Sequence, residues 1–282
     1  AFKANYQKKN DTSKTIKEMS KKYQLSRKDH LELSKYCKKK GVTYLCSAFD
    51  LDSLKYLVNK LQIPIIKIPS GEILSIDILK FASKFEGQII LSTGMSSIND
   101  IKKSLTMLKK NNVTLLHCVS LYPTTLDKVN LNNLNMLRNK FRLKVGFSDH
   151  TKSELASLTA ASMGITILEK HVTLSNKMEG PDHKSSLQIE KFAKLVKKIR
   201  LIEKIKGSNQ RLITNEEIKI KECVRKSMVA KKFLPKGTKL QNKHITFKRP
   251  GTGISPIESS LYVGKIIVKP IKKDFLIKKE NF

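Results

Sequence analysis

Short β-prone runs alternate with helical patterns through most of this chain, and that rhythm most narrows the folds open to it. Each run is a largely continuous apolar stretch, as in parallel strands buried on both faces, and successive runs begin about 20 to 30 residues apart. The runs lie at 42–49, 63–70, 88–95, 113–120, 143–148 and 166–173. The pattern predicts six βα units and a parallel sheet.

Apolar residues at helical spacing fill the intervals between these runs. The spacing predicts helices over 54–61, 98–108, 155–161 and 192–202. Eight βα units would close a (β/α)8 barrel, and an open doubly wound sheet is the structural alternative. No GxGxxG sequence follows any of the runs, which argues against a dinucleotide-binding form of the open sheet.

The pattern changes after Gly207. Residues 207–221 are polar and predict a linker, whereas 222–282 contain short β runs separated by turns. We therefore expect a large α/β domain over 1–206, a linker over 207–221 and a small β-rich domain over 222–282. A domain as small as the last one has a thin core and gains stability by packing against a partner.

The chain of 282 residues carries a formal net charge of +32. Only seven of its 56 basic residues are Arg, the preferred reader of bases and phosphates, and the lysines are spread mostly along polar helix faces. We interpret the charge as a solvated surface that helps to attract an anionic substrate, and we expect no nucleic-acid partner. The chain has no apolar run of membrane-spanning length and no visible signal peptide, which predicts a cytoplasmic protein without a membrane partner.

Two histidines stand at the ends of two successive predicted strands, His150 in KVGFSDHT and His171 in ITILEKHVT. The carboxyl ends of neighbouring parallel strands meet at one edge of the sheet, where βα folds place their chemistry. Two neutral imidazoles side by side suit a divalent metal with open positions. For either histidine alone, an ordinary strand-end role with a local hydrogen bond is the alternative, and the pair together favours the metal.

Polar side chains gather at the ends of the other strands. Hydroxyl groups before helix N-termini donate hydrogen bonds to phosphate or carboxylate, and a lysine neutralises such a charge. The set predicts a cradle for a small, highly anionic substrate, although helix capping is the alternative for any single serine. Its members are Ser47, Lys67, Ser70, Ser92, Ser120, Tyr122 and Ser148.

Three carboxylates lie near the same edge. Glu72 in PSGEIL suits general acid–base chemistry, and a first-turn residue stabilised by a helix dipole is its alternative. Glu169 lies at the end of the sixth run. Asp182 lies in a Gly-Pro turn, where an Asp is common for reasons of turn geometry alone.

Several of these motifs, in this order along the chain, resemble the sialic acid synthase family, specifically the bacterial N-acetylneuraminate synthases. The motifs are KIPSGE, ILSTGM, LLHCVSLYPT, GFSDHT, LEKHVTL and MEGPDHKSSL. The segment KRPGTGISP resembles the C-terminal antifreeze-like (SAF) domain of the same enzymes. The resemblance covers essentially the whole chain, and the ordered series is far more specific than any single motif.

The resemblance implies a (β/α)8 TIM barrel joined to a small β-rich SAF domain. It implies a transferase that forms a carbon–carbon bond, condensing phosphoenolpyruvate with an N-acetylated aminosugar, usually N-acetylmannosamine, to give N-acetylneuraminate and phosphate. It also implies a domain-swapped homodimer, in which Arg249 of KRPG reaches from the SAF domain to the aminosugar in the neighbouring subunit.

The resemblance also assigns roles to individual residues. His150 and His171 resemble the ligands of a divalent metal, Mn²⁺ or Mg²⁺, and the seven cradle residues fall where the family binds phosphoenolpyruvate. Glu72 resembles the acid or base that handles the attacking water. Glu169 and Asp182 fall where the family contacts the aminosugar and a metal-bound water, and Asp182 is also expected to be catalytic.

The chain departs from the family pattern in two places. CSAFD stands where the family has STPFD, with Ala48 in place of a proline. KANYQKKND resembles a segment that normally follows the second barrel strand, so we expect an N-terminally truncated member that lacks the first two strands and has little activity. A legionaminic acid synthase or related nonulosonate synthase is the close alternative, and a non-catalytic basic binding protein is the alternative from another class.

Overall fold

The computed structural model of the chain describes residues 2–108 and 112–282. The chain forms two compact units, Ala1–Gly207 and Ser208–Phe282, and each is described by itself. Within the described residues, no helix combines the length and the apolar character that crossing a membrane requires.

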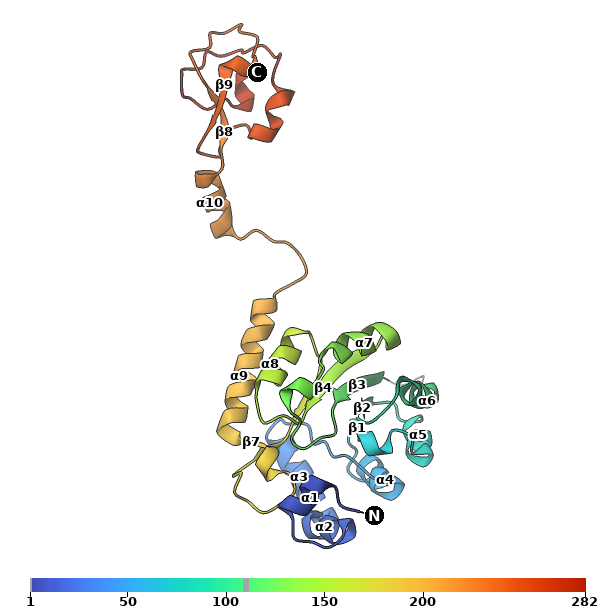
Figure 1. Ribbon diagram of the computed structural model, residues 1–282. Helices are drawn as coiled ribbons and strands as arrows, with labels where there is room; N and C mark the ends of the chain where they lie inside the picture. Colours follow the sequence, from blue (N-terminus) through green and yellow to red (C-terminus); the bar gives the residue numbers. More distant parts are fainter. Residues whose placement is uncertain (1, 109–111) are drawn as a thin grey trace. The chain divides into compact units, whose positions relative to one another are not determined.

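The first unit is built on a five-stranded parallel sheet (Figure 1). Its strands are β1 Ile65–Ile68, β2 Gln88–Ser92, β3 Asn112–Cys118, β4 Lys144–Asp149 and β5 Leu168–Lys170. Each strand pairs with the one before it in the sequence, giving the order β1-β2-β3-β4-β5. An open doubly wound sheet would reverse its strand order at a switch point, whereas a barrel adds its strands in sequence. The sheet is therefore a half-barrel of the (β/α)8 type, and five of the six predicted strands are confirmed.

The first predicted strand, 42–49, is wrong as a strand. Within residues 2–108 and 112–282, its ladder contact is a single parallel bridge between Ser47 and Lys67. The apolar signal has another cause: Tyr44, Cys46 and Ala48 pack against the core, whereas Leu45 between them is exposed. The segment thus has the period of two that a half-buried extended chain shows, without a continuous hydrogen-bonded partner.

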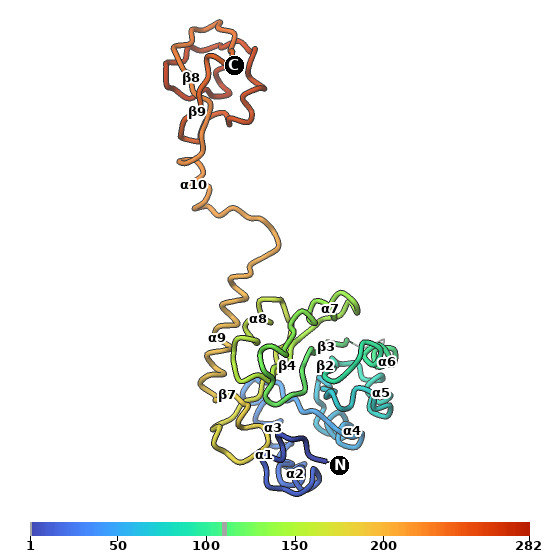
Figure 2. The backbone as a smooth tube through the Cα atoms, in the orientation of Figure 1, coloured from blue at the N-terminus to red at the C-terminus, as the bar shows by residue number. Residues whose placement is uncertain are grey.

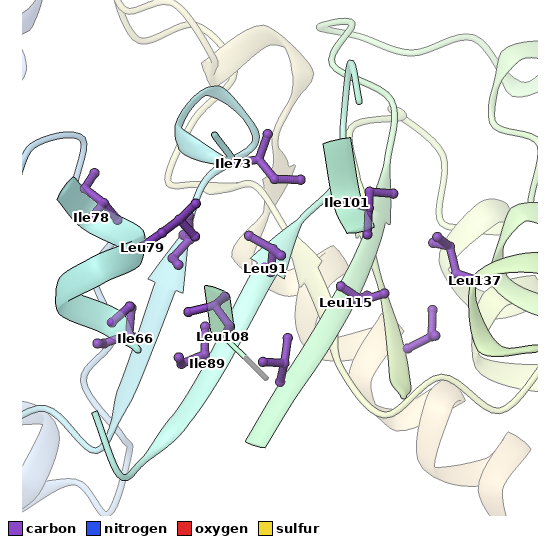
Figure 3. Close-up of a cluster of buried hydrophobic side chains, with 14 of the residues drawn as sticks. Ile66, Ile73, Ile78, Leu79, Ile89, Leu91, Ile101, Leu108, Leu115 and Leu137 are labelled. Carbon is purple, nitrogen blue, oxygen red and sulfur yellow. The ribbon is translucent and has the colours of Figure 1, made fainter. Parts of the chain in front are cut away.

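Six helices cover the outer side of this sheet in the described part of the chain: α4 Leu51–Asn59, α5 Ile76–Ala82, α6 Ile98–Leu108, α7 Asn132–Phe141, α8 Leu155–Ser162 and α9 Ile189–Lys206. Four of them, α4, α6, α8 and α9, confirm the predicted helices. Figure 3 shows the layer between sheet and helices, where Ile89 and Leu115 of the strands lie among Leu79, Ile101 and Leu108 of the helices. Burial of these side chains holds the strands, and hence the strand ends, in place.

Three further helices precede α4: α1 Asn5–Asn10, α2 Ile16–Tyr23 and α3 Arg27–Lys39. Lys3 ties this segment together, because its buried ammonium donates to the Asp11 carboxylate at 2.9 Å and to the backbone carbonyl of Ser13 at 2.7 Å. The segment lies beside the loop 174–186, as Figure 2 shows. Asn10 donates to the carbonyl of Pro181 at 2.9 Å across that contact.

Short elements complete the first unit. Strand β6 Val172–Thr173 pairs in parallel with β7 Leu187–Gln188, and this pair closes the loop 174–186 at its base. The 3-10 helices of the unit are η1 Ser70–Glu72, η2 Leu126–Lys128 and η3 His183–Ser185.

The second unit has its own small core, formed around Met228, Leu240, Ile267 and Ile277. Strand β8 Ser227–Ala230 pairs antiparallel with β9 Ile245–Lys248, and isolated bridges supply the remaining sheet contacts. Its other elements are α10 Asn215–Val224, η4 Asn242–His244, η5 Pro256–Leu261 and η6 Lys279–Asn281. Helix α10 lies largely in the segment predicted as a linker, where a capping box between Thr214 and Glu217 starts the helix.

Candidate functional site

The predicted site residues of the first unit lie at or just beyond the carboxyl ends of the parallel strands. Ser148 and Glu169 face each other across β4 and β5, and the Ser148 hydroxyl donates to the Glu169 carboxylate at 2.5 Å. His150 and His171 follow immediately on the same two strands. The parallel register thus brings together side chains that are about twenty residues apart in the sequence.

The two histidines lie side by side, with ring centroids 5.5 Å apart. Nδ1 of the buried His150 is 2.7 Å from the carbonyl oxygen of Val119. A carbonyl oxygen only accepts, so Nδ1 carries the proton and Nε2 keeps its lone pair. Burial is the main cause that lowers the pKa of His150 below its ordinary value, and the neutral ring is favoured.

The donors at this point fit a divalent metal. A ligating histidine typically donates its second ring nitrogen to a carbonyl, as His150 does. Asp182 lies next to the second histidine, with its Oδ2 at 4.0 Å from Nδ1 of His171. Its buried Oδ1 has no hydrogen-bond partner in the described residues. No group of three or more His, Cys, Asp or Glu side chains in the described part of the chain surrounds a common metal position. A metal here would therefore rest on two imidazoles and leave positions open.

Lys67 stands at the centre of the predicted anion cradle. Its side chain is buried, and Nζ donates to Ser92 Oγ at 2.8 Å and lies 3.4 Å from Oε2 of Glu169. Ser47 is bridged to Lys67 in the backbone and so shares its side of the sheet. One buried ammonium thus lies beside the hydroxyl group of Ser92 and the carboxylate of Glu169, and it supplies the positive charge that an anion would need.

A second part of the cradle surrounds Gly94. This glycine belongs to the motif ILSTGM, and no role was assigned to it from the sequence. The backbone N–H of Gly94 donates to Ser70 Oγ at 3.0 Å. A Cβ at this position would lie 2.3 Å from Ser120 Oγ and 2.8 Å from Ser70 Oγ. Two hydroxyl groups therefore converge on a space that only a glycine leaves open, and the signal in the sequence was a glycine between a strand and a helix.

Aromatic rings form one wall of the site. The Tyr122 ring lies 4.2 Å from that of His150 and 5.6 Å from that of His171, centroid to centroid. Tyr6 stacks on the other side of this wall, 5.0 Å from Tyr122. Burial, aided by the charge of Asp182, raises the pKa of Tyr6 to about 12 and keeps its hydroxyl protonated. Sequence reasoning missed Tyr6, because only the fold brings α1 to the strand ends.

Two predicted residues are not joined to this cluster by a described contact. The Glu72 carboxylate accepts a hydrogen bond from the Ser75 hydroxyl, which holds it at the end of η1 beside Ser70. Arg249 belongs to the second unit, where its Nε donates to the carbonyl of Val224 at 2.9 Å. Their predicted roles stay predictions.

Comparison with known proteins gives the family. Residues 1–211 match the NeuB family, and residues 225–282 match the SAF domain. The chain belongs to the NeuB family. Relatives of this NeuB-family chain are synthases of legionaminic, sialic and pseudaminic acids, so the reaction class is that of a transferase that forms carbon–carbon bonds.

Three of the most similar proteins illustrate the likeness. The N,N'-diacetyllegionaminic acid synthase of Campylobacter jejuni is 42% identical, over 99% of this chain and 85% of that protein. The enzyme of the same name from Legionella pneumophila is 36% identical, over 93% and 76%. The crystal structure of N-acetylneuraminic acid synthetase from Leptospira borgpetersenii is 29% identical over 77% of this chain and 76% of that one, with a TM-score of 0.70.

Proposed function

We propose that this protein is an N,N'-diacetyllegionaminic acid synthase. It would condense phosphoenolpyruvate with 2,4-diacetamido-2,4,6-trideoxymannose and release inorganic phosphate. The observation that carries this choice is the 42% identity over 99% of the chain to a synthase of that name. N-acetylneuraminate synthesis from N-acetylmannosamine, the function first suggested by the motifs, is the second candidate, supported by the likeness to the Leptospira structure.

The cradle supports binding of phosphoenolpyruvate, whose phosphate and carboxylate both carry negative charge. The Lys67 ammonium offers the countercharge, and the hydroxyls of Ser92, Ser70 and Ser120 offer hydrogen bonds. Glu169 already accepts from Ser148 and contacts Lys67, so it orients both groups. Because the cradle is largely buried, these charge-assisted bonds would be stronger than in water.

His150 and His171 would hold a divalent metal, Mn²⁺ or Mg²⁺, next to this cradle. When bound, such a metal supplies Lewis-acid polarisation of the aldehyde oxygen of the sugar. The protein's own part is to keep the His150 ring neutral through burial and to fix its orientation through the Val119 carbonyl. Asp182, with one buried oxygen unpaired, is suited to accept a hydrogen bond from the sugar.

The reaction forms one carbon–carbon bond and cleaves the bond from carbon to the phosphate oxygen. The methylene carbon of phosphoenolpyruvate uses its double-bond electrons to bond to the aldehyde carbon of the sugar, and the aldehyde oxygen takes up a proton. Water adds to the phosphate-bearing carbon and gives up one proton. The carbon–oxygen bond to phosphate then breaks, phosphate leaves with the proton of the new hydroxyl group, and a carbonyl group remains. Glu72, close in sequence to the cradle residue Ser70, is proposed to take the proton of the attacking water. We further propose a homodimer in which Arg249 contacts the sugar of the neighbouring subunit.

The test compares the two sugars directly. Protein expressed from its complete reading frame is incubated with Mn²⁺, phosphoenolpyruvate and either sugar, and released phosphate and the nine-carbon product are measured. A higher kcat/KM with the diacetamido-trideoxy sugar supports the proposal, and a higher value with N-acetylmannosamine supports the second candidate. No phosphate release with either sugar refutes both.

A further inference from the structure

A buried ion pair lies directly beneath the two histidines. Asp149 ends β4, Lys170 ends β5, and the two face each other in the parallel register. Lys170 Nζ is 2.8 Å from Asp149 Oδ2, and both side chains are almost fully buried, with exposed fractions of 1% and 0%. Neither residue belongs to the predicted site.

Every polar group of this pair has a partner. Oδ1 of Asp149 accepts from the backbone N–H of Thr151 at 2.8 Å, and Oδ2 also accepts from the hydroxyl of Ser157 in α8. The Lys170 ammonium donates to the carbonyl oxygens of Thr151 at 2.5 Å and Ser153 at 3.2 Å. The pair thus pins the strand ends to the turn that leads into α8.

The pair and the histidines occupy opposite faces of the same two strands. Successive residues of a strand point to opposite faces, so Ser148 and His150 share one face and Asp149 takes the other. The contact of Ser148 Oγ with His150 Nε2 at 3.3 Å agrees with this alternation. Each member of the pair is the residue immediately before a histidine, so a shift of either member would move the backbone that carries the next imidazole.

Strand β5 needs such a fixing contact, because it has only three residues and ends the sheet in the described part of the chain. A slip by one residue would place Glu169 opposite Asp149, two carboxylates together, and would turn His171 to the other face. A buried ion pair costs desolvation free energy that its attraction often fails to recover, so stability alone gives little reason for one here.

We propose that Asp149 and Lys170 are positioning residues that fix the register of β4 and β5 and thereby the spacing of His150 and His171. They lie on the face of the two strands opposite the histidines, so they would act through the backbone and not by contact with substrate or metal. The proposal deepens the proposed function, since the spacing of the imidazoles determines how well they hold a divalent ion. Groups that hydrogen-bond a ligating histidine typically contribute about 10- to 100-fold to metal affinity, and we expect a comparable effect from a pair that determines the position of both histidines.

The test replaces both charges at once, so that no unpaired charge stays buried. In Asp149→Asn/Lys170→Met, the amide still accepts from Thr151 and pairs with Ser157. The matched control is Asp274→Asn/Lys248→Met, which removes an ion pair of 2.6 Å whose side chains are about half exposed in the second unit. Mn²⁺ affinity is measured from the EPR signal of the free ion, and imidazole 15N–1H correlation spectra report the protonated ring nitrogen of His150.

We expect the dissociation constant for Mn²⁺ to rise about 10- to 100-fold in the first variant and to stay unchanged in the control, with both proteins folded by circular dichroism. Unchanged Mn²⁺ affinity and unchanged imidazole spectra in the first variant would overturn the proposal. If that variant does not fold, Lys170→Gln, whose amide can still donate to Thr151, is held to the same two readouts.

His150→Ala separates this proposal from the metal assignment. Loss of Mn²⁺ binding in that variant supports the assignment of the metal to the histidines. If His150→Ala binds Mn²⁺ as well as the unchanged protein does, the metal assignment fails. The imidazole spectra alone then test whether Asp149 and Lys170 position His150. Shifted His150 signals in Asp149→Asn/Lys170→Met then support the proposal, and unshifted signals refute it.

Discussion

Adding a single methyl group at Gly94 tests the architecture of the anion cradle. In Gly94→Ala the new Cβ would lie 2.3 Å from Ser120 Oγ, 2.8 Å from Ser70 Oγ and 3.0 Å from Cys118 Sγ. Contacts this short require both hydroxyl groups to move. The backbone at Gly94 does not have a positive φ, so the effect comes from the lack of space and not from backbone strain.

Two magnitudes follow from this geometry. Overpacking of a buried site costs about 1–3 kcal/mol of unfolding free energy. Each hydrogen bond to a charged group contributes about 1.5–3 kcal/mol, so displacing one hydroxyl from the anion would weaken phosphoenolpyruvate binding by about 10- to 100-fold. In the unchanged protein the Ser70 hydroxyl accepts a hydrogen bond from the Gly94 N–H at 3.0 Å, and the displacement of Ser70 would also weaken that bond.

Urea unfolding followed by circular dichroism measures the first quantity, and isothermal titration with phosphoenolpyruvate measures the second. Gly71→Ala is the matched control, because it lies one residue from Ser70 and its added methyl group would have no atom within 4 Å. Gly94→Ala/Ser120→Ala removes the shortest contact, so it should recover part of the stability without recovering the affinity. Wild-type stability and affinity in Gly94→Ala would refute the cradle as described.

Three further predictions concern other parts of the first unit. Lys67→Met removes the buried ammonium and should weaken phosphoenolpyruvate binding by about 10- to 100-fold in titration calorimetry, with the fold intact. Tyr6→Ala removes a ring stacked on Tyr122, a contact of about 0.5–1.5 kcal/mol, and should raise the KM for the sugar severalfold, while Tyr6→Phe should not. The hydrogen bond from Lys3 is the main cause that lowers the pKa of Asp11 below its ordinary value. Its contribution to stability is therefore present above the unfolded pKa of about 4 and lost as the pH falls below it, and urea midpoints of Asp11→Asn should fall less steeply in acid than those of the unchanged protein.

Much of the candidate site could be predicted because parallel strands end at one edge. Runs of apolar residues located β1 to β5, and the polar residues that follow each run had to meet there. This reasoning alone brought Lys67, Ser92, Ser148 and the two histidines together. The segment 42–49 shows its limit, since alternating burial alone does not reveal whether a neighbouring backbone completes a ladder.

Other features were not evident from local sequence. Tyr6 reaches Tyr122 across more than a hundred residues of sequence. Helix α10 did have a local signal, the capping box of Thr214 and Glu217, but its polar composition favoured a linker. Asp149 and Lys170 read as ordinary polar positions within GFSDHT and LEKHVTL. Only the register of β4 against β5 shows that they form one buried pair.

The sequence by itself determined which residues stand at strand ends, because hydrophobic periodicity and chain order are local properties. It also determined the family, through motifs that follow one another in a fixed order. Tertiary structure alone decided which side chains are neighbours and which protons and charges they keep. Burial lowers the pKa of His150. The packed strands bring Lys170 and Asp149 together as an ion pair, and they leave one oxygen of Asp182 without a partner among the described residues. Those properties depend on desolvation and distance, and both come into existence only when the strands and helices pack.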